Sequence, residues 1–525
     1  MNKTAVKTLE YFLIFAGFTA ACIFIYPVSD MFIFAADSEA TLHSVLHESL
    51  FYGNGRLLGN ILGFGFSHMF RYSFIFEAAI LTLISYLLNR LVFGGNSRTA
   101  FLSALLIIFP GLGMTGESYY VLASFLNYVV PVFFLLASLC ILKNNTKTKF
   151  GFISDLLLFI FTSAACLFSE NTTITVLTCA ILFTVYKKLT DGKAGRSSIV
   201  FVVSAFFGSA LMFLIPRLTG TGHKLDYYRG VSNSVPALLT NAYSSFAVFT
   251  KTFSEAIPMV LAVSSALFIL MPKISRKSGF LIKCVRAYLV FYPVFIIIYN
   301  ILYNTVLNNN YLFVAQMFFT VGYAASVLII ILSFEKSHFR TKLILMYSEV
   351  LISAAPMLLV NQCGYRTYYI TYAVLSVFAL EALNEARKYI ELGKSCKAAL
   401  SVLFSAAFAV TGLALMIMSA YNFNCFAVRT EYIAEKTAVI SEKIDIVPAV
   451  FGCISTEDEW PNTILNVVCE TRSEYTFVLK DSTEKCENAD EYRIITEGSI
   501  PENISFAFSN FRFKDSDIVN KMNKK

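Results

Sequence analysis

Thirteen apolar stretches, separated by more polar segments, follow one another along the chain. Because a helix rises about 1.5 Å per residue, crossing the hydrocarbon core of a bilayer takes roughly 20 mostly apolar residues. The stretches cover approximately residues 9–27, 72–93, 99–114, 120–142, 152–168, 172–187, 198–215, 256–272, 287–303, 311–333, 343–360, 366–384 and 398–419. They predict an all-α polytopic membrane protein with about 13 transmembrane helices.

Lys and Arg concentrate in every second loop between these stretches. One set of alternate loops holds, among others, Lys143, Lys187, Arg276, Lys342 and Arg387, whereas the opposite loops are longer and hold few basic residues. Cytoplasmic loops of membrane proteins carry the excess of Lys and Arg. We therefore expect a multi-pass protein of the plasma (inner) membrane with a cytoplasmic N-terminus and an external C-terminus.

The composition agrees with this prediction. Hydrophobic residues make up 56% of the chain and charged residues 15%, with a mean hydropathy of +0.64, which is too apolar for a soluble protein of 525 residues. The formal net charge of +7 comes from the basic loops, since the tail from residue 420 is net acidic. The positive charge therefore indicates topology and membrane lipids, and we expect no nucleic-acid partner.

Two long external loops and a tail interrupt the short connections. The loops cover residues 28–71 and 216–255, and each contains a segment that predicts a helix lying along the outer interface, the first at 57–70. The chain divides into a transmembrane domain over residues 1–419 and a small external α/β domain over 420–525, with a helix first and strands at NTILNVVCE and EYTFVLK. The first apolar stretch ends at Tyr26-Pro27 without a small-residue cleavage pattern, so we interpret it as an uncleaved anchor.

The candidates for chemistry begin in the first external loop. Asp30 and Asp37 follow the first stretch, and either could deprotonate an acceptor hydroxyl as a general base. Arg56, and with it Arg217 or Arg229, could hold a lipid phosphate, because the planar guanidinium binds phosphate through two parallel hydrogen bonds. The alternative is that these acids are ordinary solvated loop residues.

Other polar residues allow two interpretations each. Glu117 and Glu170 lie at the external ends of predicted spans, as site residues or as helix caps. His43 and His47 share one face of a helix and with Glu48 could bind a divalent metal; the alternative is a plain interfacial helix, and we assign no metal site and no cofactor. Four Cys of the tail, which are Cys425, Cys453, Cys469 and Cys486, permit three disulfide pairings or none. No Walker loop, dinucleotide-binding pattern, nucleophile elbow or HExxH occurs.

Several short motifs, together with this order of spans and external segments, resemble the GT-C class of membrane glycosyltransferases, and more narrowly the bacterial multi-span proteins related to GtrII-type glucosyltransferases. The matching pieces are Ser29-Asp30, Asn54-Gly55-Arg56, Gly116-Glu117, Asn127-Tyr128, Ser169-Glu170-Asn171, Pro216-Arg217 at the opening of the second loop, Arg366 and Trp460-Pro461-Asn462. The sequence departs from the pattern in two places. Asp30 stands alone where an acidic pair is expected, and Pro216-Arg217-Leu218 replaces a Pro-Gly-Asn type of turn.

The resemblance implies transfer of a sugar from a polyprenyl-phosphate-linked donor to a cell-envelope glycan acceptor on the outer face, by single displacement with inversion. Asp30 would be the base, with Asp37 sharing the role, and Arg56 and Arg217 would hold the phosphate. The remaining substrate-binding residues would be Asn54, Glu117, Asn127, Tyr128, Glu170, Arg229 and Arg366.

Two other functions fit the same sequence. A transporter or flippase of lipid-linked sugars would use acids within or beside the spans, which are Glu77, Asp155, Glu255, Glu349 and Glu381. Transporters commonly contain internal repeats with paired broken spans, and no repeat is visible here. An inactive membrane scaffold is the third possibility, favoured by the lone acid at Asp30.

Overall fold

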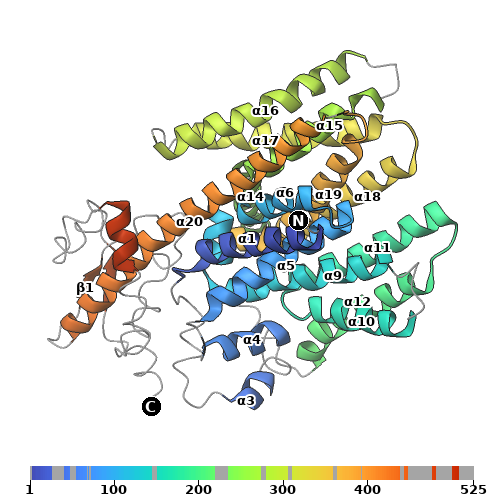
Figure 1. Cartoon of the computed structure of the whole chain (residues 1–525). Helices are drawn as coiled ribbons and strands as arrows, with labels where there is room; N and C mark the ends of the chain where they lie inside the picture. The colour runs from blue at the N-terminus through green and yellow to red at the C-terminus, as the bar shows by residue number, and fades with distance from the viewer. Residues whose placement is uncertain are drawn as a thin grey trace.

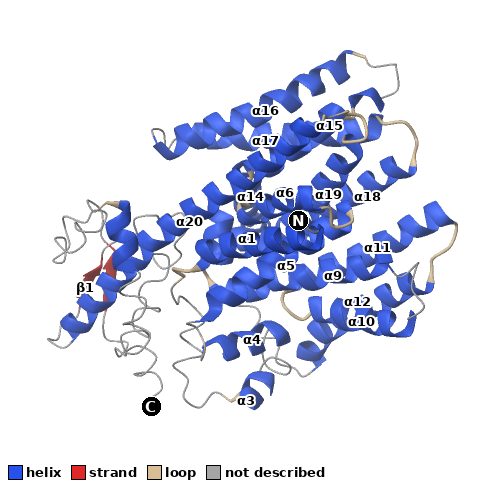
Figure 2. Ribbon diagram, in the orientation of Figure 1, coloured by secondary structure: helices blue, strands red, loops and turns tan. Residues whose placement is uncertain are grey.

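The structure is a computed structural model of the chain. It describes residues 3–25, 41–47, 55–67, 69, 72–144, 151–218, 234–273, 279–305, 310–358, 364–391, 393–437, 443–446, 476–479 and 499–507. Nearly all of this part of the chain is helical, and Figures 1 and 2 show long helices packed side by side with a small peripheral segment at the C-terminal end.

The helices follow the predicted apolar stretches. In the first half of the chain they are α1 (Lys3–Cys22), α3 (Leu42–His47), α4 (Leu57–Ser67), α5 (Ser73–Phe93), α6 (Ala100–Ile108), α7 (Leu112–Tyr119), α8 (Leu122–Ser124), α9 (Val130–Asn144), α10 (Gly151–Ala165), α11 (Glu170–Asp191) and α12 (Arg196–Leu218). In the second half they are α14 (Val235–Glu255), α15 (Ile257–Ile269), α16 (Phe280–Thr305), α17 (Asn310–Ser333), α18 (His338–Ala354), α19 (Tyr369–Ala386) and α20 (Lys394–Thr437). Short 3-10 segments cover Ser97–Thr99, Met271–Lys273, Ala355–Leu358 and Tyr365–Tyr368, and a π-helical turn covers Phe125–Val129.

The chain is a polytopic membrane protein, but the number of spans is lower than predicted. Within the described residues, nine helices are long and apolar enough to cross a membrane, or eleven if each of two bent pairs counts as one span. The prediction of 13 is not confirmed, because α10 is only 15 residues long and α19 carries Glu381 and Glu385 near its end. The segments predicted to lie along the interface are helical in α4 and α14.

Two helix pairs are sharply bent, one inside the predicted span 99–114 and one where the predicted span 256–272 begins. Helices α6 and α7 meet at 84°, and α14 and α15 meet at 73°. Pro110 and Gly111 follow α6, and a proline both lacks the N–H that a helix needs and disfavours helical geometry in the residue before it. At the second bend Pro258 is the second residue of α15, in the first turn, where its missing N–H costs nothing.

Small residues and buried tyrosines fix the contacts of the first and last long helices. Helices α1 and α20 lie side by side, and a Cβ added at Gly412 would meet the carbonyl oxygen of Gly17 at 3.2 Å. Tyr120 donates its hydroxyl to the carbonyl of Ala21 at 3.0 Å and to that of Leu415 at 3.2 Å, alternatives for one proton. In lipid, the burial of apolar side chains between helices contributes little to their association. Close backbone packing and hydrogen bonds between helices therefore hold a bundle together.

The C-terminal part agrees with the prediction only in places. Strand β1 (Lys443–Ile446) pairs in parallel with β2 (Thr476–Leu479), which lies in the predicted strand EYTFVLK. Beyond them a helix over 500–507 contacts α20, where the Asn424 side-chain amide donates to the carbonyl of Asn503 at 2.9 Å. The predicted strand NTILNVVCE and the motif with Trp460 lie outside the described residues. The α/β domain over 420–525 therefore stays a prediction.

Candidate functional site

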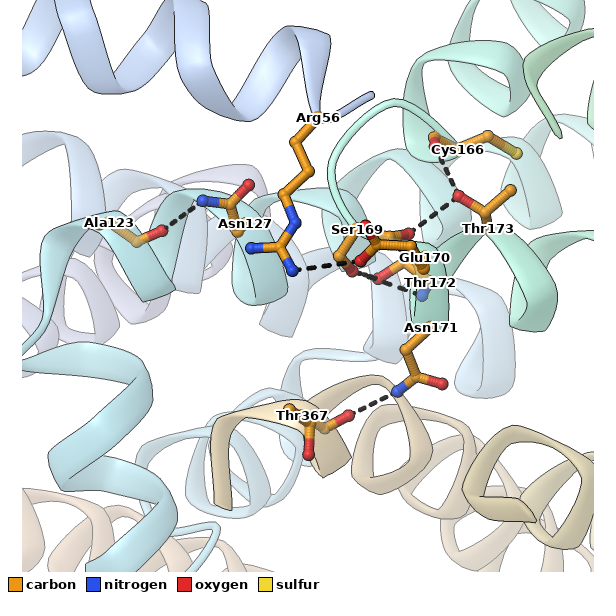
Figure 3. A network of polar contacts seen from close by, with 10 residues as sticks. All are labelled: Arg56, Ala123, Asn127, Cys166, Ser169, Glu170, Asn171, Thr172, Thr173 and Thr367. Carbon is orange, nitrogen blue, oxygen red and sulfur yellow. Dashed lines mark hydrogen bonds and ion pairs between the residues drawn. The ribbon is translucent and has the colours of Figure 1, made fainter. Parts of the chain in front are cut away.

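An ion pair joins the start of α4 to the start of α11. The guanidinium of Arg56 lies 3.1 Å from the carboxylate of Glu170, and the two side chains are 20% and 24% exposed (Figure 3). Glu170 is the first residue of α11, after the N-cap Ser169, where the unpaired N–H groups of a helix favour a negative charge. The backbone N–H of Leu58 donates to the carbonyl of Leu167 at 3.0 Å, so main-chain contact also fixes α4 beside this turn.

The π-helical turn before α9 places Asn127 and Tyr128 beside this pair. Pro131 crowds the carbonyl four residues earlier, and the Asn127 side-chain amide donates to the Ala123 carbonyl at 2.8 Å, which occupies an acceptor of the regular helical ladder (Figure 3). Both features favour the wider turn. The Arg56 guanidinium lies 5.8 Å from the centre of the Tyr128 ring, a cation–π geometry.

Asn127 also fixes how closely α4 approaches. A Cβ added at Gly59 would lie 2.0 Å from Oδ1 of Asn127, so only glycine fits at that point of α4. Asn127 is largely buried, and its Oδ1 has no hydrogen-bond partner among the described residues. A buried acceptor of this kind is a place where a bound group can donate a hydrogen bond.

A second group of polar contacts surrounds Arg366, which precedes α19. The backbone N–H of Arg366 donates to the Glu117 carboxylate at 3.1 Å, and its guanidinium donates to Oγ of Ser124 at 3.1 Å. Gly364 lies against Glu117, since a Cβ there would meet its carboxylate at 2.4 Å. Within the described part of the chain, the Arg366 guanidinium has no carboxylate in ion-pair range.

The two groups are neighbours. Asn171, next to Glu170, donates its side-chain amide to the carbonyl of Thr367 at 2.5 Å, next to Arg366 (Figure 3). Ser124, which accepts from Arg366, directly precedes the π-helical turn that carries Asn127. One site, which we call the two-arginine site, therefore contains Arg56, Glu117, Ser124, Asn127, Tyr128, Glu170 and Arg366.

The two bent helix pairs meet beside this site. Glu255, the last residue of α14, accepts a hydrogen bond from the Gly113 N–H at 2.9 Å and so caps the start of α7. Lys251, one turn earlier, lies 3.9 Å from Glu255 and 5.6 Å from the centre of the Tyr365 ring. Burial, followed by the nearby Glu255 carboxylate, raises the pKa of Tyr365 to about 12, so its hydroxyl remains a hydrogen-bond donor at neutral pH.

Comparison with known proteins adds a weak structural likeness. No protein-family model and no curated protein matches the sequence. Among solved structures, the archaeal oligosaccharyltransferase AglB from Archaeoglobus fulgidus, in complex with an inhibitory peptide and a dolichol-phosphate, matches with 13% sequence identity. The match covers 94% of this chain and 72% of the AglB chain, with a TM-score of 0.35. So low a TM-score does not establish a common fold.

The structure describes about half of the residues predicted for the site. Arg56, Glu117, Asn127, Tyr128, Glu170 and Arg366 are brought together at one end of the bundle. Asp30, Asp37, Asn54 and Arg229 lie outside the described residues. The interpretation that Pro216-Arg217 opens the second loop is wrong, because α12 continues through both to Leu218; the Arg217 side chain is outside the description.

The histidine pair does not form part of a metal site in the described residues. His43 and His47 stack on one face of α3 with ring centres 6.2 Å apart, as the spacing predicts. In the part of the chain that the structure describes, no three His, Cys, Asp or Glu side chains gather as metal ligands. Glu48, the proposed third ligand, lies outside that part.

The sequence alone gave no indication of several contacts at the site. Ser124 and Tyr365 are ordinary residues in apolar or aromatic segments, and only the fold brings them to Arg366 and Lys251. The one sequence feature that could have pointed to Tyr365 is its position next to Arg366, a predicted site residue. Gly59 is one glycine among several in its segment, and its close contact with Asn127 became visible only in the structure.

The chemistry open to this arrangement is anion binding. Arg366 has a neutral partner for its side chain, and Arg56 has Glu170 as a counter-ion. Among the acids placed here, Glu170 pairs with Arg56 and Glu117 accepts a hydrogen bond from the Arg366 backbone. A phosphate beside Arg366 would accept from the guanidinium donors that Ser124 does not use, whereas the Oδ1 of Asn127 suits a hydroxyl donor.

Proposed function

We propose that the chain is a membrane glycosyltransferase of GT-C type, which transfers a sugar from a polyprenyl-phosphate carrier to a cell-envelope glycan on the external side. The sequence resemblance supports this function, and so does the meeting of motif residues from five separate segments at the two-arginine site. The sugar, the acceptor and the base are parts of the proposal that rest on the resemblance.

The observation that carries the proposal is the Arg366 guanidinium. It is partly buried, and the hydroxyl of Ser124 is its partner among the described side chains. A guanidinium has five N–H donors in a planar fork, so the donors that Ser124 does not use can bind phosphate oxygens. Negative charge grows on the leaving phosphate as the glycosidic bond breaks, and a fixed cation there stabilises the transition state more than the ground state.

The Arg56–Glu170 pair has a different role in this proposal from the one predicted from sequence. Since Glu170 already balances its charge, Arg56 would position α4 and the preceding loop, with a weaker contribution to phosphate binding. Asp30 and Asp37 belong to that loop, and one of them would take the proton of the acceptor hydroxyl as the new bond forms.

The test is transfer of radiolabelled sugar from a panel of polyprenyl-phosphate donors into membrane glycan. We expect Arg366→Gln to lower the rate about 100-fold or more and Arg366→Lys to lower it about tenfold, because lysine keeps the charge but loses the fork. Arg90→Gln is the matched control. Arg90 lies in the last turn of α5, at the end that the basic loops predict to be cytoplasmic, and its guanidinium donates to the Tyr86 hydroxyl. Equal transfer by Arg366→Gln and the control would remove Arg366 from the mechanism.

The base is tested in the same assay. Asp30→Asn and Asp37→Asn should together abolish transfer, and each alone shows which acid acts. Retention of the wild-type rate in the double variant would leave the mechanism without its base, although Arg366 could still be assigned to phosphate binding.

One observation favours a transporter or flippase of lipid-linked sugars as the second candidate. The two bent helix pairs contact each other at their bends, where Glu255 caps α7 and Gly111 lies against Glu255. Broken spans that meet near a charged residue are typical of transporter substrate sites. Under this function Glu255→Gln would stop the movement of a fluorescent lipid-linked sugar across liposome membranes. In the transfer assay, no polyprenyl-phosphate donor would then support transfer of sugar into glycan. An enzyme would retain transfer in Glu349→Gln and Glu381→Gln.

A further inference from the structure

A cavity of about 320 Å³ lies between α9, α11, α18 and α19. Its walls are mostly aliphatic and aromatic, and include Leu135, Leu139, Leu182, Phe183 and Val377. Sites for small molecules commonly enclose about 300–1,000 Å³ with apolar walls and a few polar groups. The polar groups here are unusual for a membrane interior, since three lysines and two glutamates also line the cavity.

This cavity is separate from the two-arginine site. Helix α11 begins with Glu170 at that site and reaches the cavity's Lys187 seventeen residues later, which corresponds to about 25 Å along the helix. Helix α19 runs in the same direction, from Tyr369 beside Arg366 to the cavity residue Glu381. The cavity's charged end therefore lies at the opposite end of the bundle, on the side that the basic loops predict to be cytoplasmic.

The three lysines gather at one end of the cavity because they lie at the ends of their helices. Lys143 is next to last in α9 and donates to the Leu91 carbonyl, Lys187 lies in the last turns of α11, and Lys342 lies in the first turns of α18. Long basic side chains at such positions keep their ammonium groups near the headgroups while their stems line the apolar walls.

Carboxylates balance this charge only in part. Lys342 lies 2.6 Å from Glu381, whose side chain is 13% exposed. Lys187 lies 3.1 Å from Asp191, which is half exposed and does not line the cavity. Exposed ion pairs of this kind are weak, so Lys187 can change partners at little cost in free energy. Lys143 has no described carboxylate in ion-pair range. A group with a negative charge would complete this end.

Glu349 supplies a polar point further inside. It lies seven residues beyond Lys342 in α18, about 10 Å along the helix, and is 2% exposed. Its Oε1 accepts from the Thr178 hydroxyl at 2.7 Å, whereas its Oε2 has no hydrogen-bond partner among the described residues. A buried acceptor without a partner is costly unless a water or a hydroxyl group donates to it, so this point of the cavity suits a small donor.

We propose that the cavity binds an anionic glycerophospholipid from the cytoplasmic leaflet. The phosphate lies among Lys143, Lys187 and Lys342, and an acyl chain covers the apolar walls along α9 and α11. Free phosphate would leave the apolar walls uncovered, and a lipid without net charge would leave the lysines unbalanced. The proposal concerns a site distant from the two-arginine site and does not depend on the proposed function.

The experiment is native mass spectrometry of the full chain, incubated with equal amounts of phosphatidylglycerol and phosphatidylcholine that have the same acyl chains. We expect phosphatidylglycerol to be retained over phosphatidylcholine by about tenfold. The double variant Lys143→Gln/Lys187→Gln should lose that preference, because each basic residue near an anionic lipid contributes roughly fivefold in affinity. Lys188→Gln is the matched control, an exposed neighbour on α11 that does not line the cavity.

A second variant tests the cavity itself. Leu182→Trp should fill it and lower the retention of phosphatidylglycerol, whereas Leu189→Trp, on the same helix but 63% exposed, should not. Thermal unfolding of each variant shows whether it is folded. Equal retention of the two lipids, or wild-type retention in folded Lys143→Gln/Lys187→Gln or Leu182→Trp, would overturn the proposal. Displacement of phosphatidylglycerol by inorganic phosphate, or by an equal amount of polyprenyl phosphate, would overturn the choice of ligand.

Discussion

The Arg56–Glu170 ion pair lies at intermediate burial, and its contribution to stability should reflect that. Exposed pairs contribute about 0–1 kcal/mol, and breaking a buried pair costs about 3–5 kcal/mol, so we expect a coupling free energy of about 1–2 kcal/mol. The side chains are 20% and 24% exposed. The measurement is a double-mutant cycle of Arg56→Ala and Glu170→Ala, with unfolding of the solubilised protein followed as SDS replaces the mild detergent.

The Lys388–Glu385 pair is the control for this cycle. It is three residues apart in sequence, at 2.6 Å, and its lysine is 61% exposed. Its coupling should be at most about 0.5 kcal/mol, as for surface pairs on helices. A coupling at Arg56–Glu170 no larger than this would show that the pair is not held in place by the surrounding helices.

Gly59 tests the contact between α4 and the π-helical turn. Gly59→Ala should destabilise the protein by about 1–3 kcal/mol, because its Cβ would overlap Oδ1 of buried Asn127 at 2.0 Å. Gly65→Ala, on the same helix with nothing within 4 Å of its Cβ, should be neutral or stabilising by up to about 1 kcal/mol. The unfolding midpoints of the two variants in detergent give the comparison. Equal midpoints would mean that α4 shifts away from Asn127 without cost.

At this scale the sequence could identify which residues carry charge but could not pair them. Arg56 and Glu170 are 114 residues apart, and Arg366 and Glu117 are 249 apart, distances over which hydrophobic periodicity contains no information. The same limit explains why Arg56 was predicted to bind phosphate directly, when a carboxylate already lies beside it.

The bent helix pairs are the feature of individual elements that most constrains the site. Gly111 has φ +113°, in a region that side chains rarely adopt, and its Cβ would meet Cβ of Glu255 at 2.8 Å. Gly111→Ala should therefore cost more than Gly94→Ala, where φ is +69° and nothing lies within 4 Å. We expect a difference of about 1–3 kcal/mol, to which both the contact with Glu255 and the backbone contribute. Gly94 is in the left-handed helical region, whereas Gly111, with φ 113° and ψ 150°, is in a region that is almost exclusive to glycine.

The same comparison should be visible in the position of the helices. Fluorescence transfer between labels at Lys251 and Glu117 should change in Gly111→Ala and not in Gly94→Ala, since only the first position lies where the bent pairs touch. An unchanged signal together with equal stability would show that the bends do not depend on each other.

Hydropathy predicted the helices well and their bends poorly. Every predicted apolar stretch contains a helix, because roughly 20 apolar residues in lipid must satisfy their backbone hydrogen bonds locally. The stretch 99–114 reads as one span, although Pro110 and Gly111 end one helix and begin another at 84°. Hydropathy averaged over a span of about 20 residues hardly changes with two of them, although Pro110 and Gly111 determine where the helix bends.

For the molecule as a whole, the contacts fix which helix ends lie together. The starts of α4 and α11 and the segment before α19 gather at the two-arginine site. The end of α9, the end of α11 and the start of α18 gather at the cavity, through Lys143, Lys187 and Lys342. These two sets lie at opposite ends of α11, which is long enough to cross a membrane. Any helix that connects one set to the other must run across the bundle.

Helix α10 is such a connection, and we predict that it crosses the membrane although it spans only Gly151–Ala165. It follows the Lys143 end of α9 and precedes Glu170, and it packs beside α12 (Figure 1). Fifteen residues rise about 22 Å, less than the roughly 30 Å of the hydrocarbon core, and local thinning of the bilayer can accommodate such a mismatch.

Alkaline phosphatase, which is active only outside the cytoplasm, can test this prediction as fusions after Asn144, Ser169 and Asp191. The basic loops predict an inactive, an active and an inactive fusion in that order. Equal activity at Asn144 and Ser169 would mean that α10 leaves and returns to the same side. Equal activity at Ser169 and Asp191 would contradict the placement of Glu170 and Lys187 at opposite ends of a spanning α11. The expected alternation would place the two-arginine site outside and the lysines of the cavity inside, where the proposed donor and the proposed lipid are respectively required.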